Sequence, residues 1–461
     1  MTVSIILARL LSPSDFGAVA IINVFIVIAH VFVISGFGSA LIQNKDVDNT
    51  DFSSVLYFNI AFSVLMYILF YVTAPFIANF YGLEILCPAL RVLALRIPLS
   101  AIDVVQQAYV SRHMLFKKFF IATFAGTVVS AVVGITMAFM GFGVWALVIQ
   151  QLVNSTISTV ILWLVVKWRP ALVFSLRRMK ILFSYGWKLL CTGMMEVLYQ
   201  EMNNLIIGKA YSPVALAYYN NGNKYVRIII TNVNDSISFV LFPAMSRFQD
   251  DVEKIKAMTR RTMKTSTYII FPILAGLIGV ARPVIELLMT EKWLPSVPFM
   301  QIACVMLAFY PVQTANMEAI KALGHSGQFL RMEIIKKIIG VAGVVIAIQF
   351  GVMAIAFSAV ITMALASIIN AVAVRKYIGY RFSEQLTDVL PNLVISLVMG
   401  ACVFAVSFFS IHSDILLLLA QGFTGLVIYI VLSFIIKNDS FYYLKSTFTE
   451  LLLRKARKSI K

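Results

Sequence analysis

The chain has 461 residues, of which 60% are hydrophobic and only 13% are charged. An average soluble domain carries roughly 25% charged residues, so this composition excludes a soluble enzyme. The 38 Lys and Arg against 21 Asp and Glu give a formal charge of +17. In a membrane protein such an excess usually records topology, so we do not expect nucleic-acid binding.

Hydrophobic stretches long enough to cross a bilayer follow one another along most of the chain. At about 20 residues per crossing, hydropathy predicts fourteen membrane helices, of which the first is short. They are expected at residues 1–11, 16–42, 52–74, 88–110, 119–140, 143–166, 183–208, 214–241, 265–289, 296–320, 334–350, 352–374, 388–409 and 414–436.

The positive charges outside these stretches alternate along the chain. Connections that follow even-numbered helices, together with the C-terminal tail, hold 29 Lys and Arg, whereas connections after odd-numbered helices hold 5. Because cytoplasmic loops are enriched in Lys and Arg, this split supports the helix count and predicts that both termini are cytoplasmic. The outer connections are short, which argues against a polytopic glycosyltransferase or polymerase with a large external domain.

Two pairs of similar segments indicate an internal repeat. RLLSP at residues 9–13 returns as KAYSP at 209–213, and FGVWA at 142–146 returns as FGVMA at 350–354. Helices 1–6 and 7–12 are therefore predicted to be two copies of one unit, parallel because six is even, with helices 13 and 14 outside the repeat. Parallel halves of this kind usually hold a substrate between them and rock to give alternating access.

The predicted architecture is an all-α polytopic membrane protein in four parts. They are an N-terminal lobe, a C-terminal lobe, two additional helices and a basic cytoplasmic tail, at residues 1–170, 181–376, 386–437 and 438–461. The tail is expected to lie against anionic lipid head groups. The first helix is expected to be truncated, and we predict that roughly 10–25 residues of the natural protein precede Met1, since its stretch covers about half a bilayer.

No motif in the sequence indicates catalysis or a bound cofactor. The four cysteines and the four histidines are scattered, without a CxxC pair, which suggests neither a disulfide framework nor a metal site. We find no P-loop, HExxH or GxSxG motif in a suitable context. The expectation is therefore no metal, no cofactor and no enzymatic activity, and nucleotide-driven transport would need a partner chain.

Several short motifs resemble those of bacterial polysaccharide flippases. They are RLLSPSDFG at residues 9–17, GFGSALIQ at 36–43, GFGVWAL at 141–147 and FPA at 242–244. The resemblance is to the polysaccharide-transporter branch of the multidrug/oligosaccharidyl-lipid/polysaccharide exporter superfamily, and it covers residues 1 to about 440. It implies two six-helix lobes plus two extra helices.

The same resemblance implies a cargo and a location. The cargo would be a polyprenyl-pyrophosphate-linked oligosaccharide, moved from the inner to the outer leaflet of the bacterial cytoplasmic (inner) membrane. The product would serve the biosynthesis of lipopolysaccharide, capsule or exopolysaccharide. Membrane lipids, a polysaccharide polymerase and glycosyltransferases are the further partners to be considered.

A carrier of that cargo must shelter an anionic head while the prenyl tail stays in lipid. Arg suits this task because its guanidinium can hold two phosphate oxygens at once. Three cations within the predicted spans are candidates to bind substrate in a cationic central cavity: Arg96, Lys224 and Arg227. The structural alternative for each of them is an internal ion pair.

Carboxylates and prolines within the spans are candidates for coupling and for motion. Cation antiport could use Asp103, Glu196 or Asp235, because ionisable groups at membrane depth are functional hypotheses by default. Pro98 and Pro311 lie in corresponding helices of the two copies. Each is expected to kink its helix, either as a hinge or as a static packing feature.

Without a nucleotide-binding motif, the energy for transport must come from a gradient or from removal of product. A head with about two negative charges gains about 2.3 kcal/mol per charge per 100 mV when it moves outward down an inside-negative potential. Three alternatives to a flippase stay open: a multidrug cation antiporter, which should have an acidic cavity, a membrane-embedded transferase or polymerase, and an assembly protein without transport activity.

Overall fold

The computed structural model describes residues 2–34, 37–38, 41, 47–409, 413–446 and 449–450, and these residues form helices joined by short connections, without a strand. The α-helices of the first half are α1 (Thr2–Leu10), α2 (Pro13–Ile34), α4 (Asn49–Tyr81), α5 (Leu86–Leu93), α6 (Arg96–Arg112), α7 (Phe116–Phe139), α8 (Val144–Val165) and α9 (Leu176–Ala210). Those of the second half are α10 (Pro213–Ser246), α11 (Val252–Gly279), α12 (Ala281–Met289), α13 (Val297–Leu307), α14 (Tyr310–Ala322), α15 (Ser326–Ala347), α16 (Val352–Ile378), α17 (Phe382–Ala405) and α18 (Asp414–Ile435). Short 3-10 helices lie at Glu291–Ser296, Ile348–Phe350 and Val406–Phe408.

The protein is a multi-pass membrane protein. Ten helical segments of the described chain are long and apolar enough to cross a bilayer, and one of them, Glu291–Ala322, includes both α13 and α14. Among the other expected spans, α1 has nine residues, the stretch at 88–110 is divided between α5 and α6, and α9 and α15 carry several charged residues. The all-α, polytopic architecture expected from the sequence is thereby confirmed.

Helix α4 buries several polar side chains and exposes large apolar ones. Helix α4 buries Ser53, Asn59 and Ser63, whereas Leu65 and Phe76 on the same helix are 59% and 72% exposed. Lipid tails are as apolar as leucine, so burying Leu or Phe gains little within a membrane, while small and polar residues let helices approach and form hydrogen bonds. The exposed apolar residues of α4 therefore mark a lipid-facing surface.

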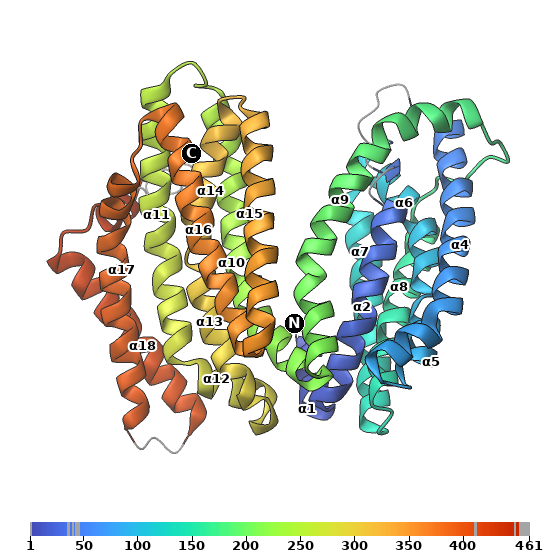
Figure 1. Cartoon of the computed structure of the whole chain (residues 1–461), viewed down its shortest axis with the longest axis horizontal. Helices are drawn as coiled ribbons and strands as arrows, with labels where there is room; N and C mark the ends of the chain where they lie inside the picture. The colour runs from blue at the N-terminus through green and yellow to red at the C-terminus, as the bar shows by residue number, and fades with distance from the viewer. Residues whose placement is uncertain are drawn as a thin grey trace, which may run out of the picture. The chain divides into compact units, whose positions relative to one another are not determined.

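The chain forms two compact units by its own contacts, Met1–Ala217 and Tyr218–Lys461. Helix α9 belongs to the first unit and runs beside α2 (Figure 1), since Gly208 of α9 packs against Ile21 of α2, and the Tyr81 hydroxyl of α4 donates to Leu205 O at 3.4 Å. The sequence repeat instead groups residues 181–208 with the second lobe, so the lobe boundaries stay a prediction.

The two units contain corresponding helix starts. Helices α2 and α10 both begin at a proline that follows a serine, and the hydroxyls of Ser12 and Ser212 accept backbone N–H groups of the first turn at 3.2 and 3.1 Å. Helices α8 and α16 both follow a glycine with positive φ, at Gly143 (54°) and Gly351 (105°). Matching helix starts of this kind are expected if the two units contain copies of one six-helix unit.

Much of the GFGSALIQ motif and most of the basic tail lie outside the described residues.

The helices that carry Pro98 and Pro311 are both interrupted just before the proline. The expected span at 88–110 is divided between α5 and α6 at residues 94–95, and that at 296–320 is divided between α13 and α14 at residues 308–309. Proline lacks an N–H and its ring clashes with the carbonyl four residues earlier, which explains why each break lies within four residues of the ring. The disturbance expected at each proline is therefore present, as a break in the helix, and the hinge role of the prolines stays a prediction.

Candidate functional site

The packing of α7 on α8 fixes how α8 is rotated. Small residues recur on the buried face of α7, at Ala122, Gly126, Ser130, Gly134 and Ala138. A Cβ at Gly126 would lie 2.0 Å from the Ser158 hydroxyl, and Asn154 donates to Ser130 at 3.2 Å. Close approach of backbones at small residues is a common way to pack membrane helices. One face of α8 is thereby committed to α7.

The neighbouring face of α8 presents its polar groups to Arg96. Arg96 is the first residue of α6, next to the break before Pro98. Its Nη1 donates to Gln151 Oε1 at 2.7 Å and its Nε donates to Ser155 Oγ at 3.0 Å. Gln151 and Ser155 are four residues apart, so they lie one above the other on one side of the helix.

The guanidinium of Arg96 is half-buried and has neutral partners. No carboxylate lies within 4.0 Å of Arg96 in the described part of the chain. His30 of α2 interacts electrostatically with Arg96. The internal ion pair, which was the structural alternative for Arg96, is therefore not formed with any described residue.

Asp103 lies two turns further along α6 and has a different partner. Its Oδ2 accepts a hydrogen bond from Gln107 on the same helix. Its Oδ1 is buried and lacks a hydrogen-bond partner among the described residues. A carboxylate oxygen in that position can accept a proton or a cation. The structure brings Arg96 and Asp103 onto one helix without pairing them.

The other candidate residues lie on α9 and α10. Glu196 of α9 is half-buried and accepts from Gln200 at 2.8 Å. Lys224 of α10 is half-buried, whereas Arg227 and Asp235 of the same helix are exposed. Lys224, Arg227 and Asp235 belong to the second compact unit and the other three to the first, so a common site for all six stays a prediction.

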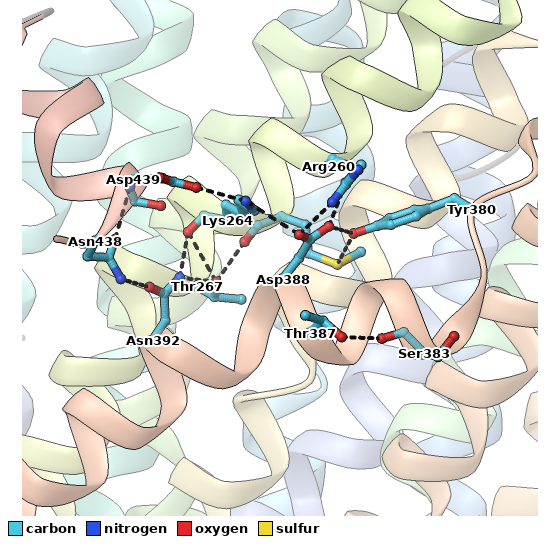
Figure 2. A network of polar contacts seen from close by, with 12 residues as sticks. Arg260, Lys264, Thr267, Tyr380, Ser383, Thr387, Asp388, Asn392, Asn438 and Asp439 are labelled. Carbon is cyan, nitrogen blue, oxygen red and sulfur yellow. Dashed lines mark hydrogen bonds and ion pairs between the residues drawn. The ribbon is translucent and has the colours of Figure 1, made fainter. Parts of the chain in front are cut away.

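A second polar cluster joins α11, α17 and the segment after α18 (Figure 2). Asp388 of α17, whose side chain is 4% exposed, accepts from Arg260 Nε at 2.7 Å and from Arg260 Nη2 at 2.9 Å. The Tyr380 hydroxyl donates to Asp388 at 2.7 Å. Burial and this hydrogen bond raise the pKa of Tyr380, which keeps the phenol protonated as a donor.

The cluster continues through amide side chains. Asn392 Nδ2 donates to the Lys264 carbonyl and to Thr267 Oγ1, both at 2.9 Å, and Asn438 donates to Asn392 at 2.8 Å. These bonds tie the segment after α18 to α11 through α17. In the sequence, Arg260 and Lys264 are indistinguishable from the other charges predicted to be cytoplasmic, because Arg260 and its partner Asp388 are 128 residues apart.

The described residues contain no group of three or more His, Cys, Asp or Glu that could hold a metal ion. The Arg96 cluster consists of a guanidinium, an amide and a hydroxyl, groups that can bind anions and sugars. The second cluster also contains the carboxylate of Asp388, which already pairs with Arg260.

Comparison with known proteins shows the family. The model of the polysaccharide biosynthesis protein family matches residues 6–298. The chain belongs to this family. Among its curated relatives, the teichuronic acid biosynthesis protein TuaB of Bacillus subtilis is 26% identical to this chain. The alignment covers 84% of this chain and 80% of TuaB. The succinoglycan biosynthesis transport protein ExoT of Rhizobium meliloti is 26% identical over 93% of this chain and 87% of its own.

Solved structures of known transporters share the fold. The lipid II flippase MurJ in an inward closed conformation aligns over 95% of this family member and 96% of MurJ, with a TM-score of 0.74 and 15% identity. A multidrug transporter of the MATE family in an inward-facing conformation aligns over 82% of this chain and 93% of its own, with a TM-score of 0.65 and 15% identity. At such low identity these likenesses concern the fold alone.

Proposed function

We propose that the protein is a flippase that moves a polyprenyl-pyrophosphate-linked oligosaccharide from the inner to the outer leaflet of the bacterial cytoplasmic membrane, for the synthesis of a cell-surface polysaccharide. Membership in the polysaccharide biosynthesis family supports the pathway. The fold shared with a lipid II flippase supports the mode of action, in which two lobes give alternating access to a central cavity.

The observation that carries the proposal is the environment of Arg96. A cation held by the neutral side chains of Gln151 and Ser155 keeps its full charge, because no described carboxylate compensates it. Burial of an uncompensated charge is costly, and an anionic ligand would remove that cost. A pyrophosphate can accept from the remaining guanidinium N–H groups, while amide and hydroxyl groups beside it can bind sugar.

Lys224 and Arg227 of α10 are proposed to bind the substrate as well, and Pro98 and Pro311 are proposed to act as hinges. Asp103, with one buried oxygen lacking a described partner, is proposed to couple transport to a proton or another cation, with Glu196 and Asp235 as further candidates. Polysaccharide polymerase and glycosyltransferases would then act on either side of the flipping step.

The proposal is tested by polymer export in cells that depend on the protein. We expect Arg96→Gln to reduce export of the surface polysaccharide and to cause lipid-linked precursor to accumulate, with at least a roughly tenfold loss of rate, since a hydrogen bond to a charged group contributes about 1.5–3 kcal/mol. Arg96→Lys should retain part of the activity, because it keeps the charge and loses the two-pronged geometry.

Arg91→Gln provides the matched control. Arg91 lies on α5 near Arg96, but its guanidinium stacks on Tyr71 at 4.2 Å and donates to the Tyr71 carbonyl at 3.1 Å. Normal export by Arg96→Gln at normal protein abundance would refute the cationic-site proposal. Resistance to lipophilic cations without any polysaccharide phenotype would favour the multidrug antiporter instead.

Ion coupling is tested separately in proteoliposomes. Asp103→Asn should remove the dependence of flipping on an imposed proton or sodium gradient. Flipping by the unaltered protein that does not change when both gradients are collapsed would rule out coupling through Asp103 and leave the flippase proposal itself intact.

A further inference from the structure

A second cationic feature lies on α11, outside the site proposed for the substrate. A pocket of about 540 Å³ is lined by Lys256, Arg260, Arg261 and Lys264 of α11 and by Asp439 and Tyr443 of the segment after α18. We call it the α11 basic pocket. Residues 256, 260 and 264 are spaced by four and therefore share one face of the helix. Four cations stand against two acidic lining residues, Glu253 and Asp439.

The buried side of the pocket holds two of these cations in fixed positions. Arg260 donates twice to Asp388. Lys256 donates to the Gly379 carbonyl at 3.1 Å and lies 3.6 Å from Glu384. Side chains that are already ordered lose less entropy when a ligand binds. The Arg260 side chain is nevertheless 42% exposed, so part of its guanidinium faces the pocket.

Arg261 supplies the uncompensated charge. Its guanidinium lies 3.5 Å above the ring centroid of Tyr443, and no carboxylate of the described residues lies within 4.0 Å of it. Stacking on the ring orients the guanidinium and leaves its edge N–H groups available to an anion.

Lys264 is held by a carboxylate that can be displaced. Its Nζ lies 3.1 Å from Asp439 and 3.4 Å from Asp388 (Figure 2). The Asp439 side chain is 82% exposed, so it can turn into solvent when another anion approaches. A phosphate group could then take the place of Asp439 beside Lys264 while it also accepts from Arg261.

The position of the pocket indicates where such a phosphate would come from. The connections that form it are among those that the Lys and Arg count predicts to be cytoplasmic. Tyr442 and Tyr443, which are 40% and 37% exposed, have the amphipathic character of aromatic residues at the level of lipid head groups. Basic pockets beside membrane helices on the cytoplasmic side are suited to anionic lipids.

We propose that the α11 basic pocket binds the phosphate of an anionic phospholipid of the cytoplasmic leaflet. Bound there, the lipid bridges α11 and the segment after α18 and reinforces the link that Asn392 and Asn438 already make. A soluble phosphate compound offers the same chemistry, so the experiment must separate the two sources.

The first arm measures lipid selectivity. The full-length protein in phosphatidylcholine micelles is titrated with phosphatidylglycerol, and the first binding constant is read by native mass spectrometry. Arg261→Gln should lower the preference for phosphatidylglycerol about fivefold, the effect of one cation near a membrane surface. Asp439→Asn should raise it, because the competing carboxylate is removed. A loss of folding could not produce these opposite signs.

Lys254→Gln is the matched control. Lys254 is an exposed cation of the same helix that lies over Phe248 and does not line the pocket, so its removal should leave the preference unchanged. Equal losses in Arg261→Gln and Lys254→Gln would reduce the effect to general surface charge and overturn the proposal. A lower preference in Asp439→Asn would overturn it as well.

The second arm titrates the protein with inorganic pyrophosphate in neutral micelles, by calorimetry. The proposal expects no binding at micromolar concentration. Pyrophosphate binding that is lost in Arg261→Gln, together with no preference for phosphatidylglycerol, would assign the pocket to a soluble phosphate and refute the lipid. Both arms read binding rather than transport, so their outcome is independent of the proposed function.

Discussion

Two arginines in this protein lie in polar clusters and differ in how their charge is balanced. Arg260 of α11 donates twice to a carboxylate, Asp388, which also accepts from Tyr380. Arg96 of α6 donates only to an amide and a hydroxyl among the described residues. The first cluster neutralises its charge within the fold, whereas the second leaves a charge that a ligand can neutralise.

This difference predicts which of the two clusters stabilises the fold and which binds a ligand, whereas the number of buried charges alone does not. A carboxylate that balances an arginine makes the pair costly to break from one side, because the partner is left unpaired. An arginine with neutral partners contributes little net stability, since its hydrogen bonds only offset its desolvation. We therefore expect stability to depend on the Arg260 cluster and transport on the Arg96 cluster.

The largest expected effect is on stability, in the Arg260 cluster. Asp388→Ala should lower the free energy of unfolding by about 3 kcal/mol, the lower end of the range for breaking a buried pair, because Arg260 is 42% exposed and partly screened. SDS titration in mixed micelles measures this quantity. A loss below 1 kcal/mol would show that Asp388 does not hold α17 to α11.

A smaller effect is expected when one neutral partner of Arg96 is removed. Ser155→Ala deletes the hydroxyl that accepts from Nε at 3.0 Å. Hydrogen bonds between membrane helices contribute about 0.6 kcal/mol on average, so the free energy of unfolding should fall by about that much. A loss comparable to that of Asp388→Ala would erase the distinction between the two clusters.

The smallest expected effect on stability is that of Arg96 itself. Arg96→Gln removes two hydrogen bonds and the cost of burying a charge together, and replacement of buried ions by neutral groups is often close to neutral. The unfolding midpoint should therefore match that of the unaltered protein, although transport is expected to fail. Thermal unfolding followed by a thiol dye measures this in a variant in which the exposed Cys191 is replaced by Ser, so that the signal reports exposure of buried Cys304. Strong destabilisation would make Arg96 a structural residue and remove the contrast.

The sequence predicted the class of the fold and several of its local features. Hydrophobic length predicted a helical membrane protein, and Pro98 and Pro311 predicted disturbed helices, which the breaks at 94–95 and 308–309 confirm. Hydropathy could not find these breaks, because it sums apolar residues along a stretch and does not register a missing backbone hydrogen bond. Nor could it assign α9, which packs on α2 in the first compact unit although the repeat aligns it with the second lobe.

What the sequence determined by itself was therefore what depends on composition and periodicity: helices throughout the described chain, a membrane environment, and corresponding helix starts at Ser12 and Ser212. Which cations have a carboxylate partner became visible only in the tertiary structure. Arg96 and Ser155 are 59 residues apart in the sequence, and Arg260 and Asp388 are 128 residues apart. Each of these contacts depends on how two helices are rotated about their axes. That rotation is set by the packing of small residues such as Gly126 against α8, an interaction between distant segments that hydropathy along one stretch does not contain.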